Sequence, residues 1–181
     1  VIEKVKQKIS LEGEDLSGID LSYENLKGAD FAGANLADAH LQNTNLEGAN
    51  FRNANLERAF LFGANLTNVN FESAVLKDAN LQDTNLEHAS LINADLEHVK
   101  LFGSHAENTD FEKANLKSAR MKRASLKKSN FAAANLSGAH LERSDLTNAN
   151  FSNADLTNAH LTSAKLDNIN FDGAKTEGLQ K

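Results

Sequence analysis

Histidine is the residue type in this chain best suited to metal binding or proton transfer near neutral pH. His140 and His160 occupy equivalent outward positions on consecutive coils of the repeat described below, so their rings should lie about 5 Å apart. A metal site needs a third and usually a fourth ligand, and the neighbours are Arg120, Glu142 and Arg143. We therefore expect a surface stack of neutral imidazoles and no metal centre. The other histidines are His40, His88, His98 and His105.

Other catalytic chemistry finds little support in the residue pattern. The chain has no cysteine, which excludes thiolate nucleophiles, thiolate metal sites and disulfides. Paired carboxylates need a cleft that separates their pKa values, and a rod without inserted loops offers none. Serine and threonine lack a visible base and orienting group, and no glycine-rich phosphate loop occurs. We expect no enzyme activity and no cofactor.

Composition leaves localisation open. The chain has 181 residues, a net charge of −6, one Met, one Tyr, and neither Pro nor Trp. No run approaches the roughly 18 apolar residues of a membrane span. The first residue is Val, which suggests a processed chain or a domain of a longer protein. The cytoplasm is the default assumption, and direct nucleic-acid binding is not expected.

A five-residue period organises residues 11–175. They divide into 33 consecutive five-residue repeat units, which we call words, such as Ala-Asn-Leu-Ala-Asp at 34–38. Leu or Phe occupies every position numbered 5n+1 from Leu11 to Phe171, except Ala106 and Met121. The residue two positions before each of these Leu or Phe residues is usually Ala. This period fits neither a helix nor a simple strand. It predicts short extended segments joined by corners, with these two positions facing inward.

Glycines locate the corners, because all 10 lie two residues after a core position and Asn often replaces them there. Both residues tolerate the positive φ that a type II turn requires at its third position. Seven of the 10 Phe recur in every fourth word, with Leu91 filling the one gap, so four words should close one coil. Coils about 4.8 Å apart give about eight coils and a rod about 40 Å long. The seven are Phe31, Phe51, Phe71, Phe111, Phe131, Phe151 and Phe171.

Stacked side chains should support the coils from outside the core. Asn25, Asn45, Asn65 and Asn85 share one outward position on successive coils and should form a hydrogen-bonded ladder.

Words of this Ala/Asn/Leu type resemble those of the pentapeptide repeat family over about nine tenths of the chain. The resemblance implies an all-β fold, a right-handed quadrilateral β-helix (solenoid) of about eight four-sided coils. It does not set the function, since members of the family do different things. Some imitate duplex DNA and bind bacterial DNA gyrase, giving quinolone resistance, and some are dimers.

The two ends depart from the repeat. Residues 1–10 predict a short N-terminal capping helix with Ile2, Val5 and Ile9 on one face; a basic membrane- or partner-binding arm is the alternative. Residues 11–175 form the repeat domain. Residues 176–181 form a C-terminal tail in which Thr176 replaces the core Leu, and the last coil could pair with a second copy in a homodimer.

The third of four faces carries unusual side chains. We number the faces by the core residues Phe31, Leu36, Leu41 and Leu46 in that order. All the aromatic residues outside the core point outward from the third face, where an apolar patch of about 300 Å² or more would indicate interaction. Protection of these rings by neighbouring long side chains is the alternative. They are Tyr23, Phe60, Phe62 and Phe102.

A basic belt is the second departure. Residues 111–130 carry seven Lys and Arg against Glu112 alone, whereas residues 1–100 carry 16 acidic and 8 basic side chains. None of the corner residues in this belt is Gly, Asn or Asp, so we expect another turn type there. The belt could bind phosphate or an acidic protein, or could reflect local fluctuation of surface charge. Its third-face members are Arg120, Lys122 and Arg123, next to Lys100 and Arg143.

These features predict a non-enzymatic protein–protein interaction or scaffold module. Its partner-binding residues are Tyr23, Phe60, Phe62, Lys100, Phe102, Arg120, Lys122 and Arg123. The alternative is a DNA-mimicking inhibitor or protector of DNA gyrase, favoured by the rod shape and the acidic first half, but not by the basic belt or by the lack of inserted loops. A membrane-associated effector and a designed repeat remain further alternatives. The small core residue Ala106 should either leave a small void between Leu86 and Leu126 or be accommodated by tilting of its neighbours.

Overall fold

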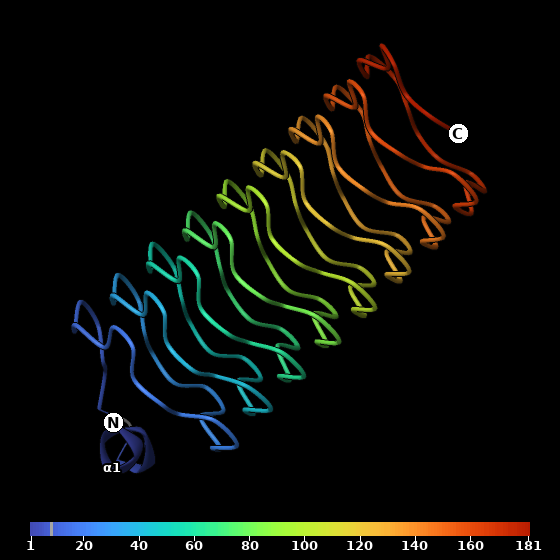
Figure 1. Cartoon of the computed structure of the whole chain (residues 1–181). Coiled ribbons are helices and arrows are strands. Elements are labelled where there is room, and N and C mark those ends of the chain that lie inside the picture. The colour runs from blue at the N-terminus through green and yellow to red at the C-terminus, as the bar shows by residue number, and fades with distance from the viewer. Residues whose placement is uncertain (8) are drawn as a thin grey trace.

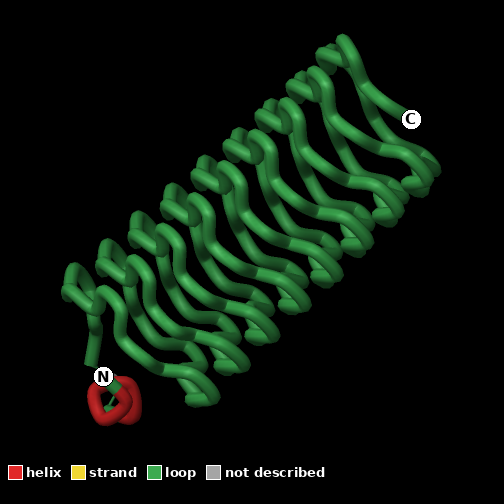
Figure 2. Tube along the Cα trace, in the orientation of Figure 1, coloured by secondary structure: helices red, strands yellow, loops and turns green. Residues whose placement is uncertain are grey.

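The computed structural model describes residues 1–7 and 9–181, and the chain forms a β-solenoid rod. The backbone winds into stacked coils, with the N- and C-termini at opposite ends of the stack (Figure 1). Within the described residues, parallel bridges join each bridging residue to its equivalent four words later, from the Asp15–Asn35 pair to the His160–Gln180 pair. This is the register that the phenylalanine spacing predicts. The bridges are one residue long and alternate with turns, so Figure 2 shows the coils as loops.

Backbone hydrogen bonds run along the rod from coil to coil. The Phe31 amide donates to the Asn50 carbonyl at 2.7 Å, and the Asn50 amide donates to the Ala29 carbonyl at 2.9 Å. The same pairing recurs word after word, so the backbone of each interior coil is bonded on both sides. A side chain therefore has an in-register neighbour on the coil before it and on the coil after it.

The core is a set of stacked columns of identical or similar side chains. Phe31, Phe51 and Phe71 are fully buried, and their ring centroids are 4.9 and 5.0 Å apart in successive pairs. The Phe111–Phe131 and Phe131–Phe151 pairs repeat this at 4.8 Å. The coil spacing sets these distances. Such pairs contribute roughly 0.5–1.5 kcal/mol beyond the burial of their area.

The corners share one backbone conformation, which corrects the expected change of turn type in the basic belt. The corner residues Lys113, Ser118, Arg123 and Lys128 have φ values of 58°, 55°, 57° and 57°, close to the 66° of Gly48. The reason is the register, because the corner amide is itself part of the ladder. The Lys113 amide donates to the Ala132 carbonyl at 2.9 Å, and this bond imposes on lysine a conformation that glycine adopts more easily.

The predicted asparagine ladder is present for Asn25, Asn45 and Asn65. The Asn45 side-chain amide donates to the Asn25 side-chain oxygen at 3.2 Å, and Asn65 donates to Asn45 at 3.2 Å. The same oxygens accept backbone amides two residues on, as Asn45 does from Glu47 at 3.2 Å. Asn85 continues the column through its backbone bridge to Asn65. The bonded asparagines thus stabilise both their own turns and the neighbouring coil.

The N-terminal helix is shorter than the predicted span 1–10. Helix α1 spans Ile2–Lys6. Val1, Ile2 and Val5 pack partly buried against the core, and Lys4 pairs with Glu14. Ile9 lies beyond the helix and is 47% exposed, so it does not share the helical face. Lys8 lies outside the described residues. The boundaries of the three predicted regions otherwise stay predictions.

The C-terminal coil is less buried than the others. Leu161 is 1% exposed, whereas Leu166, Phe171 and Leu179 are only partly buried. The Lys181 ammonium lies 5.2 Å from the centre of the Phe171 ring. Among the described residues, no helix is long and apolar enough to cross a membrane.

Candidate binding face

The coil register aligns the outward residues of the third face into columns. The residue before each core position of this face bridges its equivalent on the next coil, so the column is continuous along the rod. We call this the axial column. It begins with polar and aromatic side chains and becomes basic in the second half of the chain. Its members are Asp20, His40, Phe60, Asn80, Lys100, Arg120, His140, His160 and Gln180.

The predicted aromatic residues are exposed and lie at intervals along the third face. Tyr23 is 79% exposed, and Phe60, Phe62 and Phe102 are 39%, 41% and 37% exposed. Phe60 and Phe62 flank buried Leu61, and the Phe60 ring stacks on His40 with 4.9 Å between centroids. Phe102 and Tyr23 each lie two coils from Phe62, in opposite directions along the rod. The aromatic set is therefore spread along the face rather than gathered at one point.

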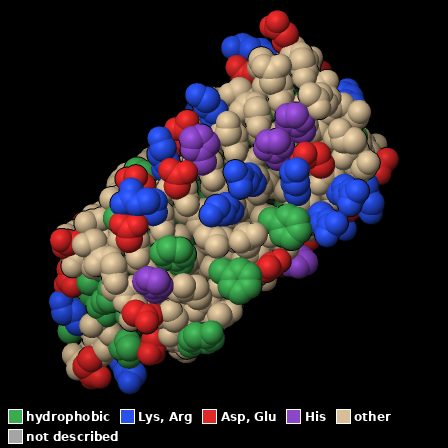
Figure 3. Space-filling model, viewed as in Figure 1, with side chains coloured by type: hydrophobic (Ala, Val, Ile, Leu, Met, Phe, Trp, Pro, Cys, Tyr) green, Lys and Arg blue, Asp and Glu red, His purple; other side chains and the backbone are tan. Residues whose placement is uncertain are grey.

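Three of the predicted basic residues meet at Phe102. Lys100, Arg120 and Lys122 line a shallow depression of about 400 Å³ together with Phe102, Gln82 and His140. A second depression of about 580 Å³ adjoins it and shares Phe102 and Lys122, with Arg123 and Arg143 in its wall. The Arg123 guanidinium carbon lies 5.7 Å from the Phe102 ring centroid. Figure 3 shows hydrophobic, Lys/Arg and His side chains near one another on the visible face of the rod, with Asp and Glu side chains among them.

Much of the basic belt is neutralised by carboxylates one coil away or beside it. Lys127 pairs with Asp145 at 3.6 Å, Lys113 with Glu112 at 2.8 Å and Lys122 with Glu142 at 2.9 Å. Exposed pairs of this kind contribute at most about 1 kcal/mol each. They do, however, offset part of the local charge, although Asp145 is shared between Lys127 and Lys165. The belt is consequently less positive than its composition indicates.

Four cations of the third face behave differently. Among the residues that the structure describes, Lys100, Arg120, Arg123 and Arg143 make no ion pair within 4.0 Å. All four lie in the walls of the two depressions beside Phe102, and Lys100 and Arg120 are adjacent in the axial column. Positive charge without a partner is thus concentrated next to an exposed aromatic ring, in a chain whose net charge is −6.

Glu142 is the one carboxylate in the wall of the second depression, within the described part of the chain, and it is already engaged. Its Oε1 atom accepts from His140 Nδ1 at 3.3 Å and pairs with Lys122 Nζ at 2.9 Å. Burial raises the pKa of the Glu142 carboxyl, but the hydrogen bonds from Lys122 and His140 outweigh it and hold that pKa below its usual value. Glu142 therefore stays ionised at neutral pH and offsets Lys122.

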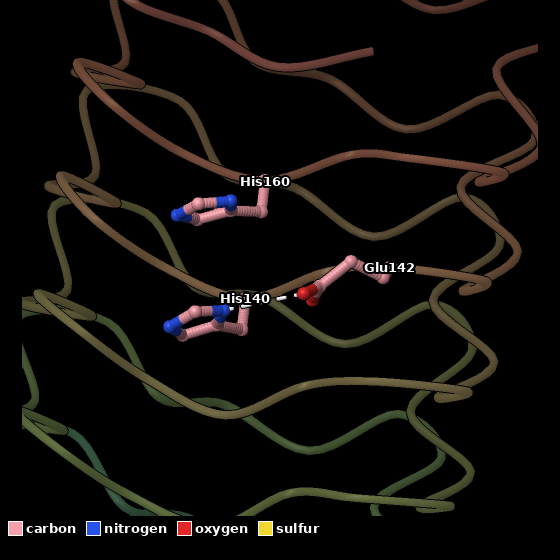
Figure 4. A group of neighbouring side chains, drawn as sticks. All are labelled: His140, Glu142 and His160. Atoms are coloured by element: carbon pink, nitrogen blue, oxygen red, sulfur yellow. Dashed lines mark hydrogen bonds and ion pairs between the residues drawn. The ribbon is translucent and has the colours of Figure 1, made fainter.

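The predicted imidazole stack is present. The His140 and His160 rings are nearly parallel, with 4.6 Å between centroids and 8° between planes (Figure 4). Ligand atoms of His140, Glu142 and His160 lie within 4.8 Å of one another. A shared ion would nevertheless need to lie about 2.0–2.1 Å from each nitrogen, in the plane of both rings. Parallel rings direct their lone pairs along parallel lines, and Lys122 adds positive charge, so this geometry does not favour a shared metal.

Sequence reasoning missed two residues of the first depression as binding residues. Gln82 is not among the predicted binding residues, and the sequence places His140 only in the expected imidazole stack. The signal that could have found them is the register itself. Gln82 lies one coil before Phe102, in the column that also holds Phe62 and Lys122, and His140 follows Arg120 in the axial column.

A stack of parallel bridges, corner residues at positive φ and a core position every five residues define the class: a β-solenoid built from five-residue repeats. The model described as "Pentapeptide repeat region" matches residues 34–111 and 58–131, and the model described as "Pentapeptide repeats (8 copies)" matches 10–47, 124–162 and 134–173. The chain belongs to the pentapeptide repeat family.

Solved structures of this type align with most of the chain. A trypsin-treated form of QnrB1, a plasmid-mediated fluoroquinolone resistance protein, is 19% identical with a TM-score of 0.51, over 93% of this chain and 90% of that chain. HetL from Nostoc sp. strain PCC 7120, involved in heterocyst differentiation regulation, is 24% identical with a TM-score of 0.40, over 98% and 93%. A pentapeptide repeat protein from the Arabidopsis thaliana thylakoid lumen is 33% identical with a TM-score of 0.44, over 56% and 68%. The likeness to QnrB1 supports the fold alone. A comparison of the sequence with curated proteins finds no relative.

Proposed function

We propose that this chain is a non-enzymatic protein–protein interaction module that binds a protein through its third face. The observation that carries the proposal is the exposed ring of Phe102 beside cations that have no carboxylate partner among the described residues. Aromatic residues and arginine are enriched at the energetic centres of protein interfaces. The supporting architecture in this proposal is a right-handed quadrilateral β-helix of about eight four-sided coils.

The third face is long and rigid enough to serve as a protein interface. Five coil steps separate Phe60 from His160 in the axial column, which corresponds to about 24 Å along the rod at about 4.8 Å per step. A standard interface buries about 800 Å² per partner, so a partner on this strip would also contact the corners on either side of it. Coil-to-coil hydrogen bonds fix the strip before binding, so little ordering cost remains to be met on association.

The positive charge of the third face determines what kind of partner surface it can attract. Between residues 99 and 163, the third face carries Lys100, Arg120, Lys122, Arg123 and Arg143 against Glu142 alone. Such a field attracts an acidic partner and repels a basic one, and it weakens as salt is added. We therefore expect the partner to present acidic groups beside an apolar or aromatic anchor.

The alternative function is a DNA mimic that inhibits or protects DNA gyrase. The observation that favours it is the fold-level likeness to QnrB1, a fluoroquinolone resistance protein, together with 16 acidic and 8 basic side chains in residues 1–100. A mimic of duplex DNA needs negative charge along most of the rod. The positive third face is the reason that we rank this function second.

A homodimer through the C-terminal coil is part of the proposal. The partly exposed side chains of Leu166, Phe171 and Leu179 supply apolar area there. Sedimentation of the chain at several concentrations tests this, with Phe171→Ser expected to shift the equilibrium to monomer.

Partner capture from a lysate tests the proposed function. The native chain is compared with a Phe60→Ser, Phe62→Ser, Phe102→Ser variant, and circular dichroism confirms that both are folded. The matched control carries Val75→Ser and Ile92→Ser, which remove outward apolar side chains from other faces. A protein captured by the native chain and the control, but not by the triple variant, supports the third face. Equal capture by all three overturns it.

A further inference from the structure

The first depression of the third face has the chemistry of an anion site. Lys100 and Arg120 occupy consecutive places in the axial column, about 4.8 Å apart along the rod. Both line the depression, and neither pairs with a carboxylate within the described part of the chain. No carboxylate is among the lining residues of this depression in residues 1–7 and 9–181. The depression therefore presents positive charge that its own wall does not offset.

One carboxylate that could compete for these two cations is Asp78, which borders a neighbouring hollow together with Lys100 and Arg120. Asp78 is engaged by His98, whose Nδ1 atom lies 3.3 Å from the Asp78 carboxylate. Asp78 makes no ion pair with either cation in the described part of the chain. Their donors are consequently available to an anion in the first depression.

The uncompensated charge amounts to two units. Lys122 also lines the depression, but Glu142 neutralises it at 2.9 Å. Lys100 and Arg120 remain, one as a point charge with three donors and one as a planar fork with five. A carboxylate would balance only one of these charges. A phosphate monoester carries about two negative charges at pH 7 and three acceptor oxygens, which suits both donors at once.

An apolar wall adjoins the charged one. The Phe102 ring lines the same depression and is 37% exposed. Arg123, 5.7 Å from the ring centroid, lies in the adjoining depression and adds positive potential near the ring. A ligand that carries a phosphate on an organic group can thus place its charge between Lys100 and Arg120 and its carbon atoms against Phe102.

We propose that the depression lined by Lys100, Phe102 and Arg120 is a recognition site for a phosphate monoester dianion carried by the protein partner, that is, for a phosphorylated side chain. This rests on the proposed function for the identity of the carrier. The recognition chemistry itself depends only on the residues of the depression. It refines the expected acidic partner to one whose binding depends on phosphorylation.

Calorimetric titration with three small probes tests the site without any partner. Phenyl phosphate carries the dianion and an apolar ring, benzoate carries a single charge and the same ring, and inorganic phosphate carries the charge alone. The expected order of affinity is phenyl phosphate, then inorganic phosphate, then benzoate. Benzoate binding as tightly as phenyl phosphate overturns the assignment of a dianion, and phenyl phosphate that gives no saturable binding at low salt overturns the site.

Matched variants separate this site from general surface charge. Lys100→Gln with Arg120→Gln should weaken phenyl phosphate binding by about tenfold or more, since each removes a charge-assisted hydrogen bond. Lys113→Gln with Lys127→Gln removes the same charge from other faces and should change binding less than about twofold. Equal losses in both double variants would show nonspecific attraction and overturn the site. Circular dichroism checks the fold of each variant, and the conservative Arg120→Lys should retain part of the binding.

The outcomes also separate this inference from the proposed function. Capture of a partner that phosphatase treatment of the lysate does not affect would overturn the inference and leave the proposed function standing. Specific phenyl phosphate binding with no third-face partner would support the site and count against the proposed function.

Discussion

The Arg123 guanidinium lies 5.7 Å from the centre of the Phe102 ring, one coil away along the rod. Arg123 also occupies a corner at φ 57°, a conformation in which a side chain is strained. Arg123 therefore strains the backbone at its corner and also contacts the exposed ring of the proposed site. Separate substitutions can test the strain and the contact.

Relief of corner strain should stabilise the rod where no contact is lost. Lys128 has φ 57°, and Lys128→Gly should raise the free energy of unfolding by about 0.5–1 kcal/mol, because glycine adopts this region without a Cβ penalty. Arg123→Gly should gain less, since it also removes the contact with Phe102, which is worth about 0.5–1 kcal/mol at an exposed site. Urea unfolding measures both. A larger gain for Arg123→Gly than for Lys128→Gly would contradict the role of that contact.

The converse substitution at a glycine corner should destabilise the rod. Gly48 has φ 66°, and a Cβ added there would meet nothing within 4 Å, so Gly48→Ala introduces strain without a clash. We expect a loss of about 1 kcal/mol. At Gly63 the added Cβ would collide with the Asn43 side-chain oxygen, so Gly63→Ala should cost more. Equal costs in thermal unfolding would indicate that Asn43 moves aside freely.

The void expected at Ala106 stays a prediction. Ala106 is fully buried in a column where Leu86 and Leu126 are its neighbours. Ala106→Leu should raise the melting temperature, since each additional buried methylene contributes about 0.8 kcal/mol if space exists. Calorimetry measures the change. A lower melting temperature would show that the column is already filled and that leucine overpacks it.

The phenylalanine stack should be sensitive to truncation in its middle. Phe131 contacts rings on both sides, at 4.8 Å to Phe111 and 4.8 Å to Phe151. Phe131→Leu should lower the free energy of unfolding by about 1–3 kcal/mol through lost stacking and a partial cavity. Unfolding in urea provides the value. No loss would mean that the coils close around the smaller side chain.

Acid should destabilise the rod through its aspartates. The hydroxyl and backbone N–H of Ser22 lower the pKa of the Asp20 carboxyl, and those of Thr157 do the same for Asp155. A lowered pKa in the folded state means that the stabilisation is present above the unfolded pKa of about 3.9 and is lost as pH falls through the folded pKa. Urea midpoints should therefore fall below about pH 4. In the Asp20→Asn, Asp155→Asn variant, the urea midpoint should fall less steeply with decreasing pH. An unchanged fall would show that other groups cause the acid destabilisation.

The coil register was predictable from sequence because a core residue in every word and a phenylalanine in every fourth word record it directly. The corner conformation of Lys113 and Arg123 was not, because local turn preference favours Gly or Asn, whereas the observed φ is imposed by hydrogen bonds from the next coil. The helix also ended early, at Lys6, since the apolar period alone does not mark a terminus.

Only part of the candidate site was predictable from the sequence, since Gln82 and His140 of the first depression were not among the predicted binding residues. The four aromatic residues share a face as expected, yet Tyr23 lies far along the rod from Phe102. The charge of the belt was overestimated because composition counts Lys122 and Lys127 without their partners Glu142 and Asp145. Those partners lie about one coil away in sequence and beside them in space. Within the described residues, Arg52 and Lys128 on other faces also lack a carboxylate partner, so what distinguishes the third face is four such cations in the depressions beside Phe102.

Site-specific photo-crosslinking tests directly whether the third face binds a protein. A benzophenone amino acid replaces Phe62 on the third face in one chain and Ile92 on the first face in another, and both are irradiated in lysate of the host. Binding through the third face predicts a discrete crosslinked product from position 62 that excess native chain competes away, with none from position 92. The same product from both positions, or from position 92 alone, would show that the third face is not the binding face.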